Sequence, residues 1–333
     1  MTDAPIACNG FLNIGDQHLA WDDKRPSRRA EGYWRHVMVK INHSIEIANE
    51  RRLIPLFLGD LFHVATGNED TLKSVLLGIL ARSWAKPVFN VGNHDKKGEK
   101  LSAADSLSVI AKSDRALVMV NPGLAGVYDV NGVLVAVGAS PYGAPIPHSV
   151  EGVGGDVGFR IWMTHHDMAF AGSYPGSIEP HPIKGCDVVL NGHMHLYRDP
   201  ARYGGTIWCN FGSIARTSID AINETPSAFE VVPGPGHTVE FFRHALPHPP
   251  ASACFSMVDR IIEASPVEIQ AMDRGAFVEM LRDDLGGGVR QSHTGHMMRD
   301  EISSRMEAWS TPGAVQAEIL SLHDEVISEP SPN

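Results

Sequence analysis

Cysteine is scarce in this sequence, and no thiolate metal motif is present. The four cysteines, Cys8, Cys186, Cys209 and Cys254, are widely spaced, and none is part of a C-x-x-C pair. This distribution argues against a disulfide framework and against a thiolate zinc site, and it is typical of a reducing compartment. We therefore expect a cytoplasmic protein.

Long apolar runs are also absent. The run VLVAVGA at 133–139 has the length of a strand, far below the roughly 18 residues that a membrane span needs. The segment MTDAPIACNG at 1–10 lacks the basic and apolar regions of a signal peptide. We expect no membrane association, and 43% hydrophobic with 20% charged residues indicates a soluble globular protein.

An excess of positive charge is missing as well. The net charge of −11 argues against a polyanionic partner, but residues 251–333 account for most of it, with 14 acidic against 6 basic residues. The run KRPSRR at 24–29 is locally basic, and it is either a solvated loop or a surface that contacts phosphates. Net charge therefore leaves a nucleic-acid substrate open.

Short apolar runs alternate with stretches of helical periodicity up to about residue 243. This order predicts a layered α/β domain over residues 1–250. Beyond the break LPHPPAS at 246–252 the composition becomes acidic and helical, so 251–333 is predicted to be a helical appendage. The predicted strands lie at 11–15, 53–59, 87–92, 133–139, 159–164, 186–192 and 206–213, the predicted helices at 31–52, 69–84 and 101–113, and a predicted hairpin at 227–247.

Polar side chains follow five of the predicted strands. Because strand ends in layered α/β folds converge on one crevice, we expect these side chains to lie together. Carboxylate, imidazole and carboxamide groups suit Mn²⁺, Fe or Zn²⁺ better than Mg²⁺ or Ca²⁺. They are too many for one ion and fit two ions that share a carboxylate. The residues are Asp16, His18, Asp60, His63, Asn93, His94, Asp95, His165, His166, His193 and His195.

The blocks D-x-H, GD, GNHD, H and GHxH occur in this order over about residues 11–215. In this pattern the chain resembles the calcineurin-like metallophosphoesterases. The resemblance implies a four-layer αββα sandwich core that hydrolyses phosphate esters. It also implies a centre with two divalent transition-metal ions, Mn²⁺ first, with Fe or Zn²⁺ as alternatives.

The resemblance implies a role for each of these residues. His94 would donate a proton or stabilise the transition state, and Asp95 would orient His94 or cap the following helix. His166 is an alternative to His165 as a ligand, but His165 directly follows its strand and is preferred. One metal would be bound by Asp16, His18, Asp60 and His195, and the other by Asp60, Asn93, His165 and His193.

Two further segments are similar to the SbcD-type nuclease subunits, which act with an SMC-like ATPase. They are GDLFH at 59–63 and NFGSIARTSI at 210–219. The similarity implies a DNA nuclease in which His63 contacts the scissile phosphodiester. It also makes 251–333 a candidate docking module for such an ATPase or another protein, against the alternative of helices packed on the sandwich.

Two departures leave the substrate open. QHLA stands where these nucleases have WHLG after the first aspartate, and 251–333 does not match their capping domain. Some phage-encoded phosphoesterases are similarly compact, so a phage or prophage source is also open. The alternative function is a small-molecule phosphodiesterase or phosphatase acting on a cyclic nucleotide or nucleotide ester, with YGAPIPHSVEGVGG at 142–155 as a lid.

Overall fold

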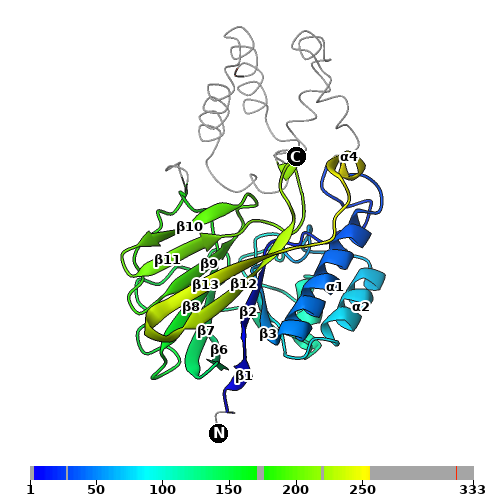
Figure 1. The fold of residues 1–333 in the computed structure, drawn as a ribbon. Coiled ribbons are helices and arrows are strands. Elements are labelled where there is room, and N and C mark those ends of the chain that lie inside the picture. Colours follow the sequence, from blue (N-terminus) through cyan, green and yellow to red (C-terminus); the bar gives the residue numbers. More distant parts are fainter. Residues whose placement is uncertain (1–3, 28, 171–175, 219–220, 256–319, 321–333) are drawn as a thin grey trace. The chain divides into compact units, whose positions relative to one another are not determined.

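The computed structural model describes residues 4–27, 29–170, 176–218, 221–255 and 320 (Figure 1). The chain divides into two units, residues 1–256 and 257–333. The first five residues of the predicted appendage are described, and they contain the short helix α4 (Ala251–Cys254). Apart from these and Leu320, the predicted helical appendage and its docking role lie outside the described residues.

One sheet of the first unit has six strands. Its four parallel strands are joined by helical crossovers, and the antiparallel hairpin predicted at 227–247 completes the sheet at one edge. The strand order is β13 (Thr238–Ala245), β12 (Ser227–Gly234), β2 (Gly10–Ile14), β3 (Leu53–Phe57), β4 (Val88–Asn90) and β5 (Leu117–Met119). The 3₁₀ turn η2 (Pro235–His237) connects β12 to β13.

The other sheet has seven strands, and its centre is parallel. Strands β7, β8, β9 and β11 run in the same direction, while β6 and β10 pair antiparallel with β7 and β11. The strand order is β1 (Ile6–Cys8), β6 (Gly123–Val130), β7 (Val133–Ser140), β8 (Phe159–His165), β9 (Val188–Gly192), β11 (Thr206–Asn210) and β10 (Arg198–Tyr203).

Three helices cover the six-stranded sheet: α1 (Tyr33–Arg51), α2 (Asp70–Leu80) and α3 (Leu107–Lys112) (Figure 1). Helix α1 buries Val37, Ile41, Ile45 and Ala48, whose spacing of three and four residues forms one apolar stripe. Its C-cap residue, Arg52, adopts a left-handed conformation with φ of 54° and donates its N–H to the last carbonyls of the helix. No helix in the described part of the chain is long and apolar enough to cross a membrane.

The strands alternate their side chains between two cores. In β3, Ile54 and Leu56 face the core between the sheets, while Leu53 and Phe57 pack under the helices. In β8, Ile161 packs between the sheets, whereas Trp162 points to the outer face of the seven-stranded sheet. Because the central strands β2, β3, β4 and β9 are buried on both faces, they read as nearly continuous apolar runs in the sequence.

The predicted α/β class and all seven predicted strands are confirmed. The outer face of the seven-stranded sheet differs from an αββα pattern in the described residues, because loops rather than helices cover it. Ile146, Val150 and Ile183 from these loops pack on Trp162 and Trp208. The segment 141–158 contains three prolines and five glycines, which disfavour helix formation. Strands β1, β5, β6 and β10 were not predicted.

The core between the sheets can be tested at Ile161, whose side chain is fully buried there. Replacing Ile161 with Ala removes packed methyl and methylene groups and should lower the free energy of unfolding by about 2–5 kcal/mol. Leu124→Ala on β6 is the matched control, because Leu124 is 45% exposed, and it should change stability by less than about 0.5 kcal/mol. Urea denaturation measures both, and equal losses would contradict the assigned core.

Candidate metal centre

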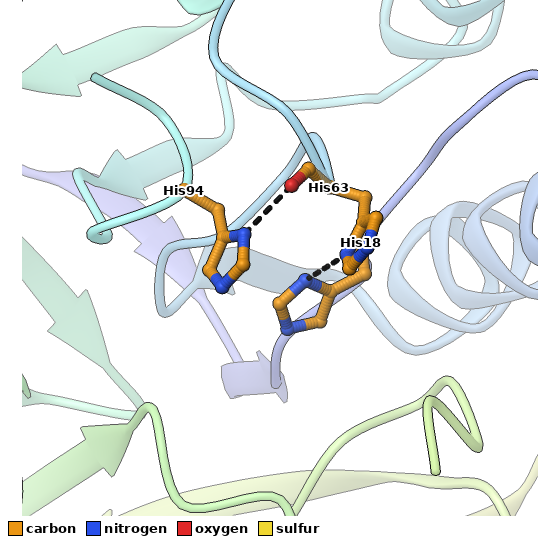
Figure 2. Close-up of side chains that lie close together, drawn as sticks. All are labelled: His18, His63 and His94. Atoms are coloured by element: carbon orange, nitrogen blue, oxygen red, sulfur yellow. Dashed lines mark hydrogen bonds between the residues drawn. The ribbon is translucent and has the colours of Figure 1, made fainter. Parts of the chain in front are cut away.

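The carboxyl ends of five strands meet at one place, as the sequence predicts. Strands β2, β3 and β4 of the six-stranded sheet lead to His18, Asp60 and His94, and β8 and β9 of the other sheet lead to His165 and His193. Figure 2 shows the rings of His18, His63 and His94, which come from three different loops, gathered around one volume. The centre therefore spans both sheets.

One group of ligand atoms belongs to Asp16, His18, Asp60 and His195, and these atoms all lie within 4.8 Å of one another. The Nε2 atoms of His18 and His195 face each other at 2.9 Å. The Nε2 atom of His18 also lies 3.6 Å from Oδ2 of Asp60. These four residues are the ones that the sequence predicts for one metal.

The second group combines Asp60, His165 and His193, and Asn93 lies among them. The Nε2 atom of His165 is 3.3 Å from Oδ2 of Asp60 and 3.1 Å from Oδ1 of Asn93. The same Asn93 oxygen is 2.9 Å from Nδ1 of His193. Asp60 therefore belongs to both groups, which is the position of a carboxylate shared by two ions.

Outer contacts determine which ring nitrogen faces inward. His165 donates from Nδ1 to the Leu58 carbonyl at 2.9 Å, which leaves Nε2 for the centre. The Nδ1 atom of His195 is 2.9 Å from the Thr217 hydroxyl, and Nε2 of His193 is 3.4 Å from the Asp167 carboxylate. Such partners fix the tautomer and orientation of a ligating histidine.

The choice between His165 and His166 follows from the same contacts. Both ring nitrogens of His166 are engaged by the backbone. Its Nε2 donates to the Ala144 carbonyl at 2.8 Å, and its Nδ1 accepts from the His165 N–H at 3.2 Å. Only His165 presents a nitrogen to Asp60 and Asn93, so the geometry favours His165 as the ligand.

The backbone is strained at several of these positions. Asp16, His18, Asp60 and His193 have positive φ angles of 30°, 45°, 51° and 75°, a region that residues other than glycine rarely adopt. Each such residue costs of order 1–3 kcal/mol, and such strain clusters at functional sites. The folded structure therefore holds these side chains in place at a cost in stability.

Two glycines let the strand ends approach closely. A Cβ at Gly92 would overlap with the carboxylate of Asp60, and a Cβ at Gly59 would lie 2.5 Å from Nδ1 of His165. Gly59 also has a φ of 117°, which disfavours any side chain. The glycines that precede Asp60 and Asn93 in the sequence are therefore required by the packing of the centre.

The clustered residues fit divalent metal ions. The Oδ2 atom of Asp16 is buried and has no hydrogen-bond partner. The inward-facing nitrogens of His18 and His195 are close together, and a cation between them would satisfy both. With no thiolate among the donors, the mixture of imidazole nitrogens and carboxylate or amide oxygens suits Mn²⁺, Fe or Zn²⁺.

Burial and charge set the protonation of these donors. Burial lowers the pKa of His18 and of His195, which favours the neutral ring, the form in which imidazole binds a metal. Burial alone would raise the pKa of Asp60, but His165 and His18 outweigh it and hold the pKa well below its usual range. Burial opposes protonation of His165, yet Asp60 raises its pKa to about 9, so metal binding there must displace a proton.

His63 and His94 belong to neither of the groups that contain Asp60, but with His18 they form a third group, whose ring nitrogens all lie within 4.8 Å of one another. Their rings stack at 5.2 Å between centroids, and Nδ1 of His63 is 3.3 Å from Nδ1 of His18. His94 donates its backbone N–H to Oδ1 of Asp60 at 2.8 Å, and its Nδ1 donates to the His63 carbonyl at 2.6 Å (Figure 2). The other ring nitrogen of His94, Nε2, takes no part in these two contacts.

Asp95 has partners other than the predicted one. Its side chain is fully buried and accepts the backbone N–H groups of Gly92 at 2.9 Å and Phe62 at 3.3 Å. The His63 carbonyl, not Asp95, therefore orients the His94 ring. Burial and the nearby Asp60 raise the pKa of Asp95 to about 7. Asp95 ties the loops after β3 and β4 together.

The sequence leaves the basic run at 24–29 as either a solvated loop or a phosphate-contacting surface, and its described basic side chains make contacts within the chain. Lys24 donates to the Gly67 carbonyl, and Arg25 donates to the carbonyls of Asp22 and Arg29. The side chain of Arg29 is buried, so it cannot reach a nucleic-acid backbone. The described basic residues of this run are engaged in local structure.

No protein-family model and no curated protein matches this sequence. Solved structures match at low similarity. A hypothetical protein from Thermus thermophilus is 12% identical, with a TM-score of 0.42, over 71% of this chain and 99% of that chain. A 5'-nucleotidase precursor from the same organism is 12% identical, with a TM-score of 0.42, over 79% of this chain and 59% of that chain. At this similarity, neither structure assigns a family or an activity.

The shared position of Asp60 makes a prediction about metal content. The wild-type protein, purified without chelator, should contain about two transition-metal ions per chain. Asp60→Asn should lose most of both, because it removes a charged ligand from each group. Asp156→Asn, a change at an exposed loop carboxylate, is the control and should retain the wild-type content. Elemental analysis measures all three, and full metal content in Asp60→Asn would contradict the shared ligand.

Proposed function

We propose that this protein is a metal-dependent phosphoesterase that hydrolyses phosphodiester bonds. The observation that carries the proposal is the carboxylate of Asp60, which belongs to two adjacent groups of ligand atoms. An arrangement of two ions around one carboxylate is suited to in-line displacement at phosphorus. The five sequence blocks that resemble the calcineurin-like metallophosphoesterases supply the same residues in the same order.

Bound at this centre, two divalent ions would supply a nucleophile at neutral pH and neutralise charge on the phosphoryl oxygens. The chain itself supplies His94. Its ring is held by the His63 carbonyl at 2.6 Å, and its backbone N–H is held by Asp60 at 2.8 Å, so the side chain is fixed beside the ligands. Nε2 of His94 can then hold or donate a proton at the leaving oxygen.

We propose DNA as the substrate class. His63 supports this choice, since its ring stacks on His94 and contacts His18 at the edge of the centre. An imidazole there could bind the phosphoryl oxygen that remains esterified in a diester, which a phosphomonoester lacks. The segment 210–219, similar to SbcD-type nucleases, supports the same choice through Thr217, which contacts the ligand His195 at 2.9 Å.

One observation favours a second candidate, a small-molecule phosphodiesterase acting on a cyclic nucleotide or nucleotide ester. A nuclease normally binds the DNA backbone through basic residues, and this binding weakens as salt rises. The described residues of the basic run at 24–29 are engaged by carbonyls or buried. They are therefore not arranged for such contacts.

The role of His94 can be tested directly. His94→Ala should reduce the rate of phosphodiester hydrolysis by roughly 10²–10⁴-fold, the usual contribution of a positioned general acid. The metal content should stay at the wild-type level, because His94 is absent from both groups that share Asp60, and the group it forms with His18 and His63 contains no carboxylate. His237→Ala, at a side chain that is 69% exposed, is the control and should keep full activity. A joint loss of metal and activity would show that His94 is a ligand instead.

The substrate class can be tested with His63. In Mn²⁺, the wild-type protein should degrade DNA and cleave aryl phosphodiesters faster than aryl phosphomonoesters. His63→Ala should slow diester cleavage at least roughly tenfold more than monoester cleavage, because it removes a charged or hydrogen-bonded contact to the esterified oxygen. Metal content is measured alongside, since His63 contacts the ligand His18. Turnover of cyclic nucleotides without DNA degradation would instead establish the second candidate.

A further inference from the structure

Three buried cationic side chains gather at a place that the metal centre does not use. Arg29 precedes helix α1, Lys40 lies within α1, and Arg216 follows β11. The three side chains surround Cys254 of helix α4, and they are only 2%, 2% and 7% exposed. Charged side chains are seldom this deeply buried unless they are paired.

Arg29 has donors without an acceptor. Its guanidinium group lies between two aromatic rings, 4.8 Å from the centroid of Tyr33 and 4.7 Å from that of Phe255. The two rings contact the faces of the guanidinium plane, but they do not accept the hydrogen bonds that its N–H groups can donate. The Nε and Nη1 atoms are buried and have no hydrogen-bond partner. An arginine cannot lose its charge to relieve this cost.

The neighbouring cations increase the positive charge. Arg216 donates to the carbonyls of Glu224 at 2.8 Å and Pro249 at 3.3 Å, so its hydrogen bonds add no negative charge. Burial, followed by the charge of Arg29, lowers the pKa of Lys40 to about 7. No carboxylate forms an ion pair with any of these three side chains in the described part of the chain.

We propose that the Arg29–Lys40–Arg216 cluster is a binding site for a small oxyanion of the sulfate or phosphate class. The anion would accept hydrogen bonds from the unpartnered Arg29 nitrogens and offset the buried positive charge. It would also hold the chain around 249–255 against the first loop. That contact already includes a hydrogen bond of 2.9 Å from the Ala30 N–H to the Cys254 carbonyl.

The proposal is independent of the reaction at the metal centre, although the two sites are neighbours. Tyr33, which stacks on Arg29, donates its hydroxyl to the carbonyl of the ligand His18 at 3.0 Å. An oxyanion could also bind among the histidines of the centre. The experiment must therefore separate the two sites.

Sulfate binding to metal-free full-length protein provides the test. Equilibrium dialysis with labelled sulfate should show saturable binding of about one ion per chain. Sulfate and phosphate should both raise the unfolding temperature above that in chloride of equal ionic strength, because a ligand that binds only the folded state stabilises it. Acetate is the third arm, and stabilisation by acetate at equal affinity would assign the site to carboxylates instead.

Variants locate the site. Arg29→Met and Lys40→Met should each weaken sulfate binding at least roughly tenfold, since each removes a charge-assisted contact. Their matched controls are Arg115→Met and Lys112→Met, at exposed residues, which should bind as the wild type does. Lys40→Met should unfold at a higher temperature without sulfate, because it removes buried repulsion.

Two results would overturn the proposal. They are absence of saturable sulfate binding to the wild type and unchanged affinity in Arg29→Met or Lys40→Met. If either methionine variant fails to fold, the other variant and the wild-type dialysis still decide. In that case, aromatic stacking and backbone carbonyls alone would hold the three buried cationic side chains.

Discussion

The carboxylate of Asp60 is the group on which the arrangement of the centre depends. It belongs to both groups of ligand atoms, accepts the backbone N–H of His94, and holds the charge of His165 in place. To reach this position, Asp60 adopts a φ of 51° at the end of β3, in the middle of the parallel strands. A buried carboxylate with this backbone conformation lowers the stability of the fold unless a bound cation offsets its negative charge.

Asp60 can reach this position because the strand ends of the two sheets lie close together. His165 and Gly192 end neighbouring strands of the seven-stranded sheet, and the loop after β3 lies against them. A Cβ at Gly192 would lie 2.8 Å from Nδ1 of His165 and 2.9 Å from the Leu58 carbonyl. Glycine is therefore needed at the strand ends of both sheets, at Gly59 and Gly92 in one and at Gly192 in the other. The large apolar core between the sheets offsets the strain collected at its edge.

Most of the strands, and the gathering of the polar side chains that follow them, could be predicted from the sequence, because buried apolar runs end in glycine or polar residues. What could not be predicted depends on contacts distant in sequence. Asp95 is bonded to Phe62, 33 residues away, rather than to its neighbour His94. Asp167 and Thr217 gain their roles only when β9 brings His193 and His195 to them. Strand β6 is half-exposed and contains two glycines, so its apolar pattern is weak.

The run at 24–29 shows how packing changes the meaning of a charge pattern. In the sequence alone, the four basic residues of this run could form a surface that contacts phosphates. In the structure Lys24 and Arg25 are tied to carbonyls, and Arg29 is buried beside Lys40 and Arg216. The count of charges in the sequence therefore does not say which of these cations face the solvent. The positive charge of Arg29 is directed inward, and its Nε and Nη1 atoms are buried without a hydrogen-bond partner among the described residues.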